Sequence, residues 1–351
     1  MEGRPPLEFL VSKLPELLEH FGLQGEFRWK ELDSFDDRNL MVTFEDGRKY
    51  VVKAHNTLLP SGSLERLDAQ DRLMCQLHSQ GLPVPEVLYR DGCSTYTLPS
   101  PVPALVRILT YLEGDLIKNE APKSPALLRR IGALCGSVAV ALESFDAKGF
   151  QWTWAWDMKR LPEVVRSKLP FISADRRPLA ERLCHAYAER LCTERPEHGG
   201  RLCDVLPHTV LHADLNDTNL LFADDEVVGV IDFGDSIHSC RIFEPGITAG
   251  YFSLGQADPV LVLSEVLRGY LQRVPWEISE DEVLAYFHVA RGRILLSVAF
   301  AAENRHLEPD NEYLAHTAEP GWAVLTALDC EAEVLPRLRA LVTDEKGSKP
   351  P

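Results

Sequence analysis

The fold of this chain is decided by residues 208–235, which read HTVLHADLNDTNLLFADDEVVGVIDFGD. The stretch contains three apolar runs, at residues 209–212, 219–222 and 227–231. Apolar runs of this length, bounded by Asp and Asn, are typical of short strands joined by tight turns. The polar residues that begin, end or link the runs are Asp214, Asn219 and Asp232. We therefore expect one small sheet, with these three side chains converging at one end of it.

The spacing of these three residues fits phosphoryl transfer. In that reaction a carboxylate accepts the proton of the attacking hydroxyl, while an amide and a second carboxylate hold Mg²⁺ against the nucleotide phosphates. Protein kinases carry the same groups in the patterns H-R-D-x-x-x-x-N and D-F-G. This chain has H-A-D at residues 212–214, then Asn219, and D-F-G at residues 232–234. We expect Asp214 to be catalytic and Asn219 and Asp232 to bind the metal ion; the alternative is a β-hairpin with Asx turns.

The same loop also differs from that of protein kinases, because it lacks the Arg of H-R-D and no A-P-E segment follows D-F-G. Its pattern H-x-D-L-N-x-x-N resembles the aminoglycoside phosphotransferase and choline kinase superfamily, which phosphorylates small molecules. The segments HADLNDTNLL, VIDFGD and SFDDRN are most similar to the hydroxylysine kinase family, over roughly residues 25–330. The resemblance implies a bilobal, protein-kinase-like fold of the α+β class, with a small antiparallel-sheet N-terminal lobe and a mostly helical C-terminal lobe.

The composition limits the class of protein further. A chain of 351 residues with 45% hydrophobic content can bury one large core or two lobes. The net charge of −16 argues against a nucleic acid or an acidic membrane as partner. We find no stretch of about 18 apolar residues and no signal peptide, and we therefore expect a cytoplasmic protein that contacts no membrane.

The eight cysteines are scattered and form no C-x-x-C pair. A zinc site was considered at four of the cysteine and histidine residues, Cys184, His185, Cys192 and His198. Their spacing matches no common zinc site, so we expect reduced thiols on a helix.

Residues 1–110 are expected to form the nucleotide-binding lobe. Periodicity predicts helices at residues 7–21 and 64–80 and strands at 27–32, 39–44, 49–54, 87–89 and 104–110. The loop between the first two strands lacks the glycines of a protein kinase phosphate loop, but short polar residues can present backbone N–H groups to phosphates. The resemblance to the hydroxylysine kinase form of this loop assigns nucleotide contacts to Ser34 and Phe35.

Lys53 ends the apolar run YVVK and needs an anionic partner. We expect it to contact the α- and β-phosphates of the nucleotide, oriented by a carboxylate on the following helix; the alternative is an edge-strand Lys that reaches solvent. The acidic residues of that helix are Glu65, Asp68 and Asp71. The resemblance favours Asp68, although relatives usually have the longer Glu there.

Residues 109–114, LTYLEG, resemble the hinge of this superfamily. The resemblance implies that backbone groups near Thr110 and Leu112 meet the purine edge. Side chains do not distinguish adenine from guanine, so both ATP and GTP are open as donors with Mg²⁺, and the similarity to hydroxylysine kinases implies GTP.

Residues 111–340 are expected to form the second lobe, followed by a disordered tail at 341–351. Helices are predicted at residues 127–144, 180–194, 260–274, 281–304 and 322–328. The first of these carries Gly132 and Gly136, which permit close helix packing. Trp152, Trp154 and Trp156 are candidates for an aromatic wall that binds a cation, or for a core plug.

Four further residues are candidates for binding the acceptor. Asp235 follows the expected metal ligand by three positions, and we expect Asp235 and Glu244 to bind ammonium groups at the mouth of the cleft; the alternatives are helix capping and surface salt bridges. Arg291 and Arg293 lie two apart on a helix, so only one of them can face the cleft and bind a carboxylate.

These features together predict a kinase that transfers the γ-phosphate of a nucleoside triphosphate to a hydroxyl of an amino acid or amino-alcohol. The resemblance makes 5-hydroxylysine the first choice, and an aminoglycoside, ethanolamine or choline kinase the alternative. An alternative of another class is a pseudokinase that serves as a binding module. Retention of Lys53, Asp214, Asn219 and Asp232 together argues against it.

Overall fold

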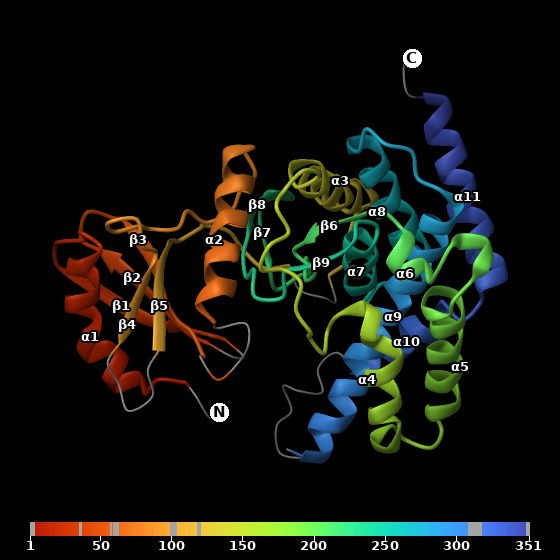
Figure 1. The fold of residues 1–351 in the computed structure, drawn as a ribbon, viewed down its shortest axis with the longest axis horizontal. Coiled ribbons are helices and arrows are strands. Elements are labelled where there is room, and N and C mark those ends of the chain that lie inside the picture. The colour runs from red at the N-terminus through yellow and green to blue at the C-terminus, as the bar shows by residue number, and fades with distance from the viewer. Residues whose placement is uncertain are drawn as a thin grey trace. The chain divides into compact units, whose positions relative to one another are not determined.

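The structure is a computed structural model that describes residues 4–34, 37–56, 58, 63–98, 104–117, 121–307 and 318–348. The chain forms two compact units, shown in Figure 1, and each is described by itself. The first comprises Met1–Gly114, Lys148–Phe150 and Val228–Gly234, and the second comprises Asp115–Ala147, Gln151–Val227 and Asp235–Pro351. The sequence predicts two uninterrupted lobes that meet at residues 110 and 111. Nothing in the sequence pattern indicates that Lys148–Phe150 and Val228–Gly234 belong to the first unit.

The first unit contains a five-stranded antiparallel sheet in the order β1-β2-β3-β5-β4. Its strands are β1 Phe27–Leu32, β2 Arg38–Phe44, β3 Lys49–Ala54, β4 Thr95–Leu98 and β5 Ala104–Thr110, and its helices are α1 Leu7–His20 and α2 Leu64–Ser79. The strand predicted at residues 87–89 is wrong, because Val87 forms only an isolated bridge with Leu109. The sequence also missed β4, since four residues are too few for a clear alternation.

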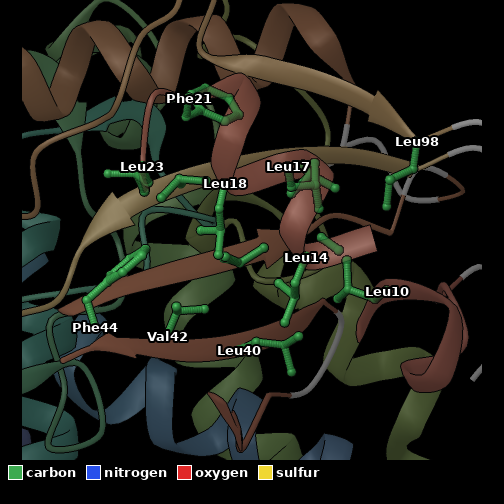
Figure 2. Packing of buried hydrophobic residues seen from close by; sticks show 14 residues of the cluster. Leu10, Leu14, Leu17, Leu18, Phe21, Leu23, Leu40, Val42, Phe44 and Leu98 are labelled. Atoms are coloured by element: carbon green, nitrogen blue, oxygen red, sulfur yellow. The ribbon is translucent and has the colours of Figure 1, made fainter. Parts of the chain in front are cut away.

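The core of the first unit lies between α1 and one face of this sheet (Figure 2). Leu10, Leu14 and Leu17 recur at helical spacing and are all buried. Side chains alternate between the two faces of a strand, so Val52 on β3 points into this core. The same alternation sends Lys53 to the opposite face of the sheet.

The second unit is mostly helical. Its helices are α3 Pro125–Ala141, α4 Leu161–Lys168, α5 Arg177–Tyr187, α6 Leu202–Val205, α7 Phe243–Phe252, α8 Pro259–Arg273, α9 Glu280–Leu307, α10 Ala318–Ala327 and α11 Glu331–Ser348. Ser124 and Asp258 accept hydrogen bonds from backbone N–H groups in the first turns of α3 and α8, which explains where these helices begin. The predicted α+β class, with an antiparallel sheet in the N-terminal part and helices in the C-terminal part, is confirmed.

Two helices differ from the expectation. Residues 341–348 belong to α11, so the prediction of a disordered tail is wrong for them. Helix α9 is long and apolar enough to cross a membrane by length and composition, which differs from the expectation that no such stretch occurs. Of its most apolar window, 83% is buried inside the protein, as expected for the central helix of a helical core.

The small sheet expected at residues 209–231 is two separate two-stranded sheets, so that prediction is wrong. The strands concerned are β6 His208–Leu211, β7 Leu220–Ala223, β8 Glu226–Val230 and β9 Ile237–Cys240. β6 pairs with β9, which the sequence missed, and β7 pairs with β8. Asp224 and Asp225 adopt the left-handed conformation that a tight hairpin turn requires.

The contact between α3 and α8 gives a first prediction. A Cβ atom at Gly132 would lie 2.0 Å from the carbonyl oxygen of Val266, which is backbone and cannot move aside. We expect Gly132→Ala to lower the free energy of unfolding by about 3 kcal/mol, measured by urea denaturation. Gly246→Ala is the control, because its Cβ would lie no closer than 3.0 Å to the side chain of Val289 and 3.1 Å to the carbonyl oxygen of Tyr286. A Gly132→Ala variant no less stable than this control would contradict the prediction.

Candidate active site

The loop between β6 and β7 carries Asp214 and is fixed by backbone hydrogen bonds. The buried carboxylate of Glu244, in the first turn of α7, accepts the N–H of His212 at 2.6 Å and the N–H of Ala213 at 3.1 Å. Ala213 has a φ of 67°, a conformation that costs a residue with a Cβ atom about 1–3 kcal/mol. Such strain persists only where neighbouring contacts fix the backbone, and Glu244 supplies those contacts.

The second half of the loop is organised by Asn216. Its Oδ1 accepts hydrogen bonds from the backbone N–H of Thr218 at 2.9 Å and of Asn219 at 3.1 Å. This side-chain turn holds Asn219 at the start of β7 without any contribution from the sheets. The side chain of Asn216 therefore helps to place Asn219.

The carboxylate of Asp214 is held from both sides. Asn219 Nδ2 donates to Asp214 Oδ2 at 2.8 Å, and Arg293 Nη2 on α9 donates to Asp214 Oδ1 at 2.8 Å. Both partners lie in the second unit together with Asp214. Two donors on one carboxylate fix its orientation and leave it an acceptor, which is what a general base for a hydroxyl proton requires.

Arg293 is almost completely buried and uses its whole guanidinium group. Besides Asp214, it donates to the hydroxyl of Tyr251 at 3.1 Å and to the carbonyl oxygen of Trp156 at 3.1 Å, and it lies 4.6 Å from the centre of the Trp156 ring. Burial lowers the pKa of Arg293, and Tyr251, Asp214 and Asp235 outweigh burial, so the net shift of the pKa is upward. Arg293 is therefore a fixed positive charge beneath Asp214.

Lys53 and Asp232 meet in the first unit. Lys53 Nζ lies 3.2 Å from Asp232 Oδ1 and 3.3 Å from Asp37 Oδ2. Burial lowers the pKa of Lys53, and Asp232 and Asp37 outweigh burial and raise the pKa above its usual value. Asp232 has a φ of 64°, so this residue too is held in a conformation rare for a side chain with a Cβ atom.

The expected pair between Lys53 and Asp68 is wrong. Within the described residues Lys53 forms no ion pair with α2, and Asp68 lies on the exposed side of that helix. The buried side of α2 presents Asp71, which pairs with Arg107 on β5. Helix α2 reaches the Asp-Phe-Gly segment through Arg66, which donates to the carbonyl oxygen of Gly234 at 3.4 Å.

The remaining candidates for nucleotide contacts are in the first unit. The carbonyl oxygen of Ser34 accepts a hydrogen bond from Arg4 at 3.2 Å, and Phe35 lies outside the described residues. Thr110 is tied to Glu86 by its N–H and by its hydroxyl. In the part of the chain that the structure describes, no hydrogen bond involves the backbone of Leu112, so its N–H and C=O remain available for a purine edge.

Each unit carries an oxygen donor of the kind that holds the metal ion of a kinase. Asn219 Nδ2 faces Asp214, and its Oδ1 accepts no hydrogen bond from another described residue. The side chain of Asp232 is 53% exposed and carries a carboxylate. Mg²⁺ in kinases is held by one or two such oxygen ligands together with phosphates and water, so a dense cluster of acids is not needed. Asn219 belongs to the second unit and Asp232 to the first.

Asp235, Trp154 and Trp156 line a pocket in the second unit, whereas Trp152 is not part of its lining and stacks on Trp154. The pocket has about 290 Å³ of empty space, its open mouth included, and its lining includes Trp154, Trp156, Ala213, Asp235, Ser239 and Arg293. Trp154 Nε1 donates to Asp235 at 3.0 Å, and Trp156 stacks on Phe300. The hydroxyl of Ser239 is buried and has no hydrogen-bond partner among the described residues, so the pocket floor offers an unused polar group.

Two residues expected to bind the acceptor are not available for it. Glu244 is bound to the backbone of His212 and Ala213, because it opens α7 directly beneath that loop. Arg291 is buried, stacks 4.4 Å from the ring of Phe287 and lies 3.3 Å from Glu331. The corresponding predictions for Glu244 and Arg291 are wrong.

Arg293 and Asp37 have roles that the sequence analysis missed. Arg293 was expected at an acceptor carboxylate, and it binds Asp214 instead. An Arg within the apolar run of α9 signals a buried anionic partner, since an unpaired buried charge is too costly. The pairing register of β2 and β3 could have indicated the role of Asp37. Arg38 faces Ala54 in this register, so Asp37, one residue earlier, lies beside His55.

Glu244 gives a prediction about pH. Burial raises its pKa from 4.5 to about 7, and Asp214 adds to this shift, while the N–H groups of Ala213 and His212 and the charge of Arg293 oppose it. The folded protein therefore binds a proton that the unfolded chain releases between pH 4.5 and about 7. The stabilisation from this proton is complete below pH 4.5 and is lost as the pH rises through about 7.

The expected size of this loss is about 3 kcal/mol, from about 1.4 kcal/mol for each pH unit of the shift. Chemical denaturation at pH values from 4.5 to 8 measures it, with Glu244→Gln as the reference because Gln does not titrate. We expect the stability of the wild type relative to Glu244→Gln to fall across this range. A difference that does not depend on pH would contradict the prediction.

Comparisons with known proteins show what this chain is similar to. Residues 28–284 match the model of the phosphotransferase enzyme family. A hydroxylysine kinase of Mus musculus is 28% identical over 324 residues, which cover 85% of this chain and 83% of that protein. A homoserine kinase of Pseudomonas aeruginosa is 29% identical over 281 residues, which cover 76% and 79%. The solved structure of the amicoumacin kinase hAmiN with AMP-PNP, Ca²⁺ and Ami has a TM-score of 0.65 at 16% identity, and it covers 91% of this chain and 96% of that one.

Proposed function

We propose a function from one premise: this chain belongs to the phosphotransferase enzyme family. It is a kinase that acts on hydroxyl groups of small molecules, with a nucleotide as donor and a divalent metal ion. The finer proposal is transfer of the γ-phosphate of GTP or ATP, with Mg²⁺, to the hydroxyl of a hydroxylated amino acid, and specifically of 5-hydroxylysine. The observation that supports it most is the Asp214 carboxylate, held by Asn219 and Arg293 as a fixed proton acceptor.

A residue of this chain can be assigned to each role in the proposed reaction. Asp214 accepts or orients the proton of the attacking hydroxyl. Asn219 and Asp232 hold Mg²⁺, which when bound neutralises charge on the phosphates. Lys53 contacts the phosphates as a point charge.

The nucleotide is bound by backbone groups at its other end. Thr110 and Leu112 contact the purine, and the resemblance assigns contacts with the phosphates to Ser34 and Phe35. Backbone groups accept either purine, so both GTP and ATP are donors to be tested.

The protein acts in the cytoplasm, in keeping with eight cysteines that are all free thiols.

The acceptor is proposed to bind through its ammonium group. Asp235 supplies a carboxylate that suits an ammonium group in the pocket of the second unit, and Trp154 and Trp156 line the same pocket. The hydroxyl of Ser239 is available for a polar group that enters more deeply. Hydroxylysine and homoserine, which name the two relatives described above, are both hydroxylated amino acids, and this supports the acceptor class over aminoglycosides and cholines.

A panel of acceptors tests the proposal. The purified protein is incubated with Mg²⁺ and either ATP or GTP, and with 5-hydroxylysine, homoserine, kanamycin, choline or ethanolamine. We expect the highest kcat/KM with 5-hydroxylysine. Equal or greater turnover of kanamycin, choline or ethanolamine would contradict the acceptor class, and greater turnover of homoserine would contradict 5-hydroxylysine. Nucleotide binding without turnover of any acceptor would favour the pseudokinase alternative.

A further inference from the structure

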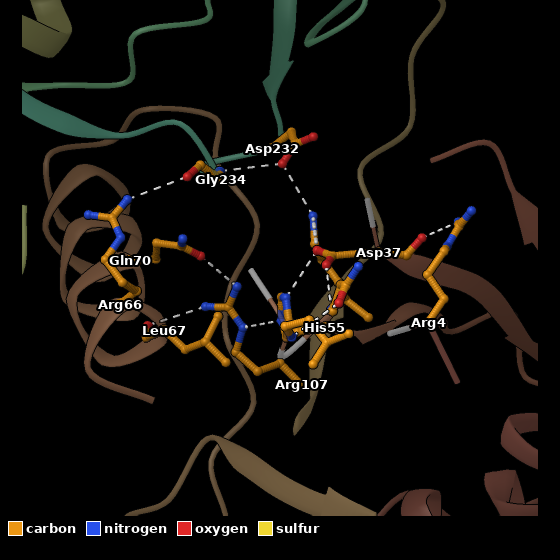
Figure 3. A network of polar contacts seen from close by, with 12 residues as sticks. Arg4, Asp37, His55, Arg66, Leu67, Gln70, Arg107, Asp232 and Gly234 are labelled. Carbon is orange, nitrogen blue, oxygen red and sulfur yellow. Dashed lines mark hydrogen bonds and ion pairs between the residues drawn. The ribbon is translucent and has the colours of Figure 1, made fainter. Parts of the chain in front are cut away.

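A continuous network of charged and polar side chains surrounds Lys53 on the face of the sheet opposite α1 (Figure 3). All of it lies in the first unit. The network begins at Asp232, passes through Lys53, Asp37 and His55, and ends at Arg107, which α2 holds. Its members come from the β1–β2 loop, β3, β5 and the Asp-Phe-Gly segment, so it joins four parts of the unit.

Asp37 is the best-fixed carboxylate beside Lys53. Its side chain is only 17% exposed, and it accepts hydrogen bonds from His55 Nδ1 at 3.0 Å and from the backbone N–H of Asn56 at 3.0 Å. Burial raises the pKa of Asp37, and Lys53 together with these two hydrogen bonds outweighs burial, so the pKa lies well below its usual value. Asp37 is therefore a permanent anion that cannot turn away from Lys53 without losing two donors.

The direction of the hydrogen bonds fixes the state of His55. Arg107 Nε always donates, so His55 Nε2, 3.0 Å away, must be the acceptor, and the ring proton lies on Nδ1 and points to Asp37. Burial and Arg107 lower the pKa of His55 to about 4, which keeps the ring neutral near pH 7. Arg107 is itself held by Asp71, with which it pairs, and by Gln70 Oε1 at 2.8 Å.

The strand register brings these groups together. Asn39 faces Lys53 across β2 and β3, and Lys53 faces Arg107 across β3 and β5. The buried carboxylate of α2, Asp71, pairs with Arg107 and not with Lys53. This arrangement explains why the helix orients Lys53 only indirectly.

We propose that Asp37, from the loop between β1 and β2, is the positioning residue that orients Lys53 toward the nucleotide phosphates, in place of a carboxylate on α2. The inference rests on the proposed function, in which Lys53 contacts the phosphates and Asp232 binds the metal ion. Because Asp232 must then serve the metal, it is not a lasting partner for Lys53, and Asp37 is. Helix α2 supports the arrangement through Arg107 and His55.

Hydrogen bonds with the N-terminal segment also hold the backbone on either side of Asp37. Arg4 donates to the carbonyl oxygens of Ser34 and Asp37, and Arg38 Nε donates to the carbonyl oxygen of Pro5 at 2.8 Å. The N-terminal segment thus holds both ends of the described part of the loop. The backbone of Asp37, which orients Lys53, is thus held by the N-terminal segment.

The test compares Asp37→Asn with Asp68→Asn, a matched change at the exposed acid of α2 that the sequence analysis had favoured. Binding of AMP-PNP and GMP-PNP, and of adenosine and guanosine, is measured by calorimetry with Mg²⁺ and no acceptor. We expect Asp37→Asn to weaken binding of the triphosphate analogue at least about tenfold, because Lys53 is then no longer held toward the phosphates. Binding of the nucleoside, which has no phosphates, should be unchanged, and Asp68→Asn should match the wild type in every measurement.

A double-mutant cycle separates positioning from a general loss of structure. In the background of Lys53→Met, Asp37→Asn should cause little further loss of triphosphate affinity, because the residue that it positions is absent. Full additivity of the two changes, wild-type affinity in Asp37→Asn, or an equal loss in Asp68→Asn would overturn the proposal. If Asp37→Asn does not fold, Asp37→Glu keeps the charge and displaces the ammonium, and wild-type affinity in that variant would overturn the proposal equally.

The outcome is independent of the acceptor, because none is present in the binding measurements. Failure to phosphorylate 5-hydroxylysine would therefore correct the proposed acceptor and leave the role of Asp37 standing. Wild-type affinity in Lys53→Met would instead overturn both the role of Asp37 and the assignment of Lys53 to the phosphates.

Discussion

Asp214→Asn is expected to lower kcat by about 10²- to 10⁴-fold, the usual cost of removing a general base, while the affinity for Mg²⁺-nucleotide stays close to that of the wild type. The physical reason is that the amide nitrogen cannot accept the proton of the attacking hydroxyl. Steady-state kinetics with the best acceptor and calorimetric binding of a non-hydrolysable nucleotide measure the two effects separately. A kcat near that of the wild type would refute the role assigned to Asp214.

Asp214→Asn should also lower the stability of the folded protein. Both neighbours of Asp214, Asn219 Nδ2 and Arg293 Nη2, are donors, and an amide can accept from only one of them. We expect a loss of about 1–3 kcal/mol in the free energy of unfolding, the cost of leaving one buried donor without a partner. Asp225→Asn is the matched control, because Asp225 is exposed in the β7–β8 turn and Asn tolerates its left-handed conformation.

Asp232→Ala tests metal binding separately from general-base catalysis. Asp232 is proposed as a metal ligand, so its loss should weaken Mg²⁺-nucleotide binding, whereas Asp214→Asn should not. A variant of Asp232 that binds Mg²⁺-nucleotide as tightly as the wild type would remove Asp232 from the metal site.

Much of the first unit follows from local pattern. Three strands of the sheet, β1, β3 and β5, begin and end at the predicted residues, because each is a short run rich in apolar, aromatic or β-branched residues. By contrast β4, β9 and α7 were missed. Helix α7 is buried on all sides, so its residues show no amphipathic period, and β4 and β9 are only four residues long.

Among the site residues, too, contacts between residues close in sequence were easier to predict than contacts between residues distant in sequence. Spacing alone identified Asp214 and Asn219 as neighbours, because a short loop restricts where both can lie, and they are hydrogen-bonded. Partners that are distant in sequence were assigned wrongly: Lys53 was paired with the nearest acidic helix, and Arg293 with an acceptor. Which of several acids lies beside a buried cation depends on strand register and helix rotation, and these follow from tertiary packing.

Arg293→Met is expected to have the second large effect, on stability and on catalysis together. The change removes a buried positive charge and leaves Asp214 with one donor, while the hydroxyl of Tyr251 and the carbonyl oxygen of Trp156 lose theirs. Breaking a buried ion pair by removal of one partner costs about 3–5 kcal/mol in the free energy of unfolding. A carboxylate that can turn away from its productive orientation should in addition lower kcat by about 10²-fold.

Arg291→Met is the control that distinguishes these two effects. Arg291 lies two residues earlier on α9 and is also buried, but its partners are Glu331 and the carbonyl oxygen of Leu328, which have no part in the site. We expect this control to lose stability and to keep the kcat of the folded fraction. Arg293→Lys, in turn, keeps the charge but cannot reach Asp214, Tyr251 and Trp156 at once, since a single ammonium replaces the planar fork. Its kcat should therefore stay low although its stability partly recovers; a kcat equal to that of the wild type would show that charge alone, without the fork, is enough to orient Asp214.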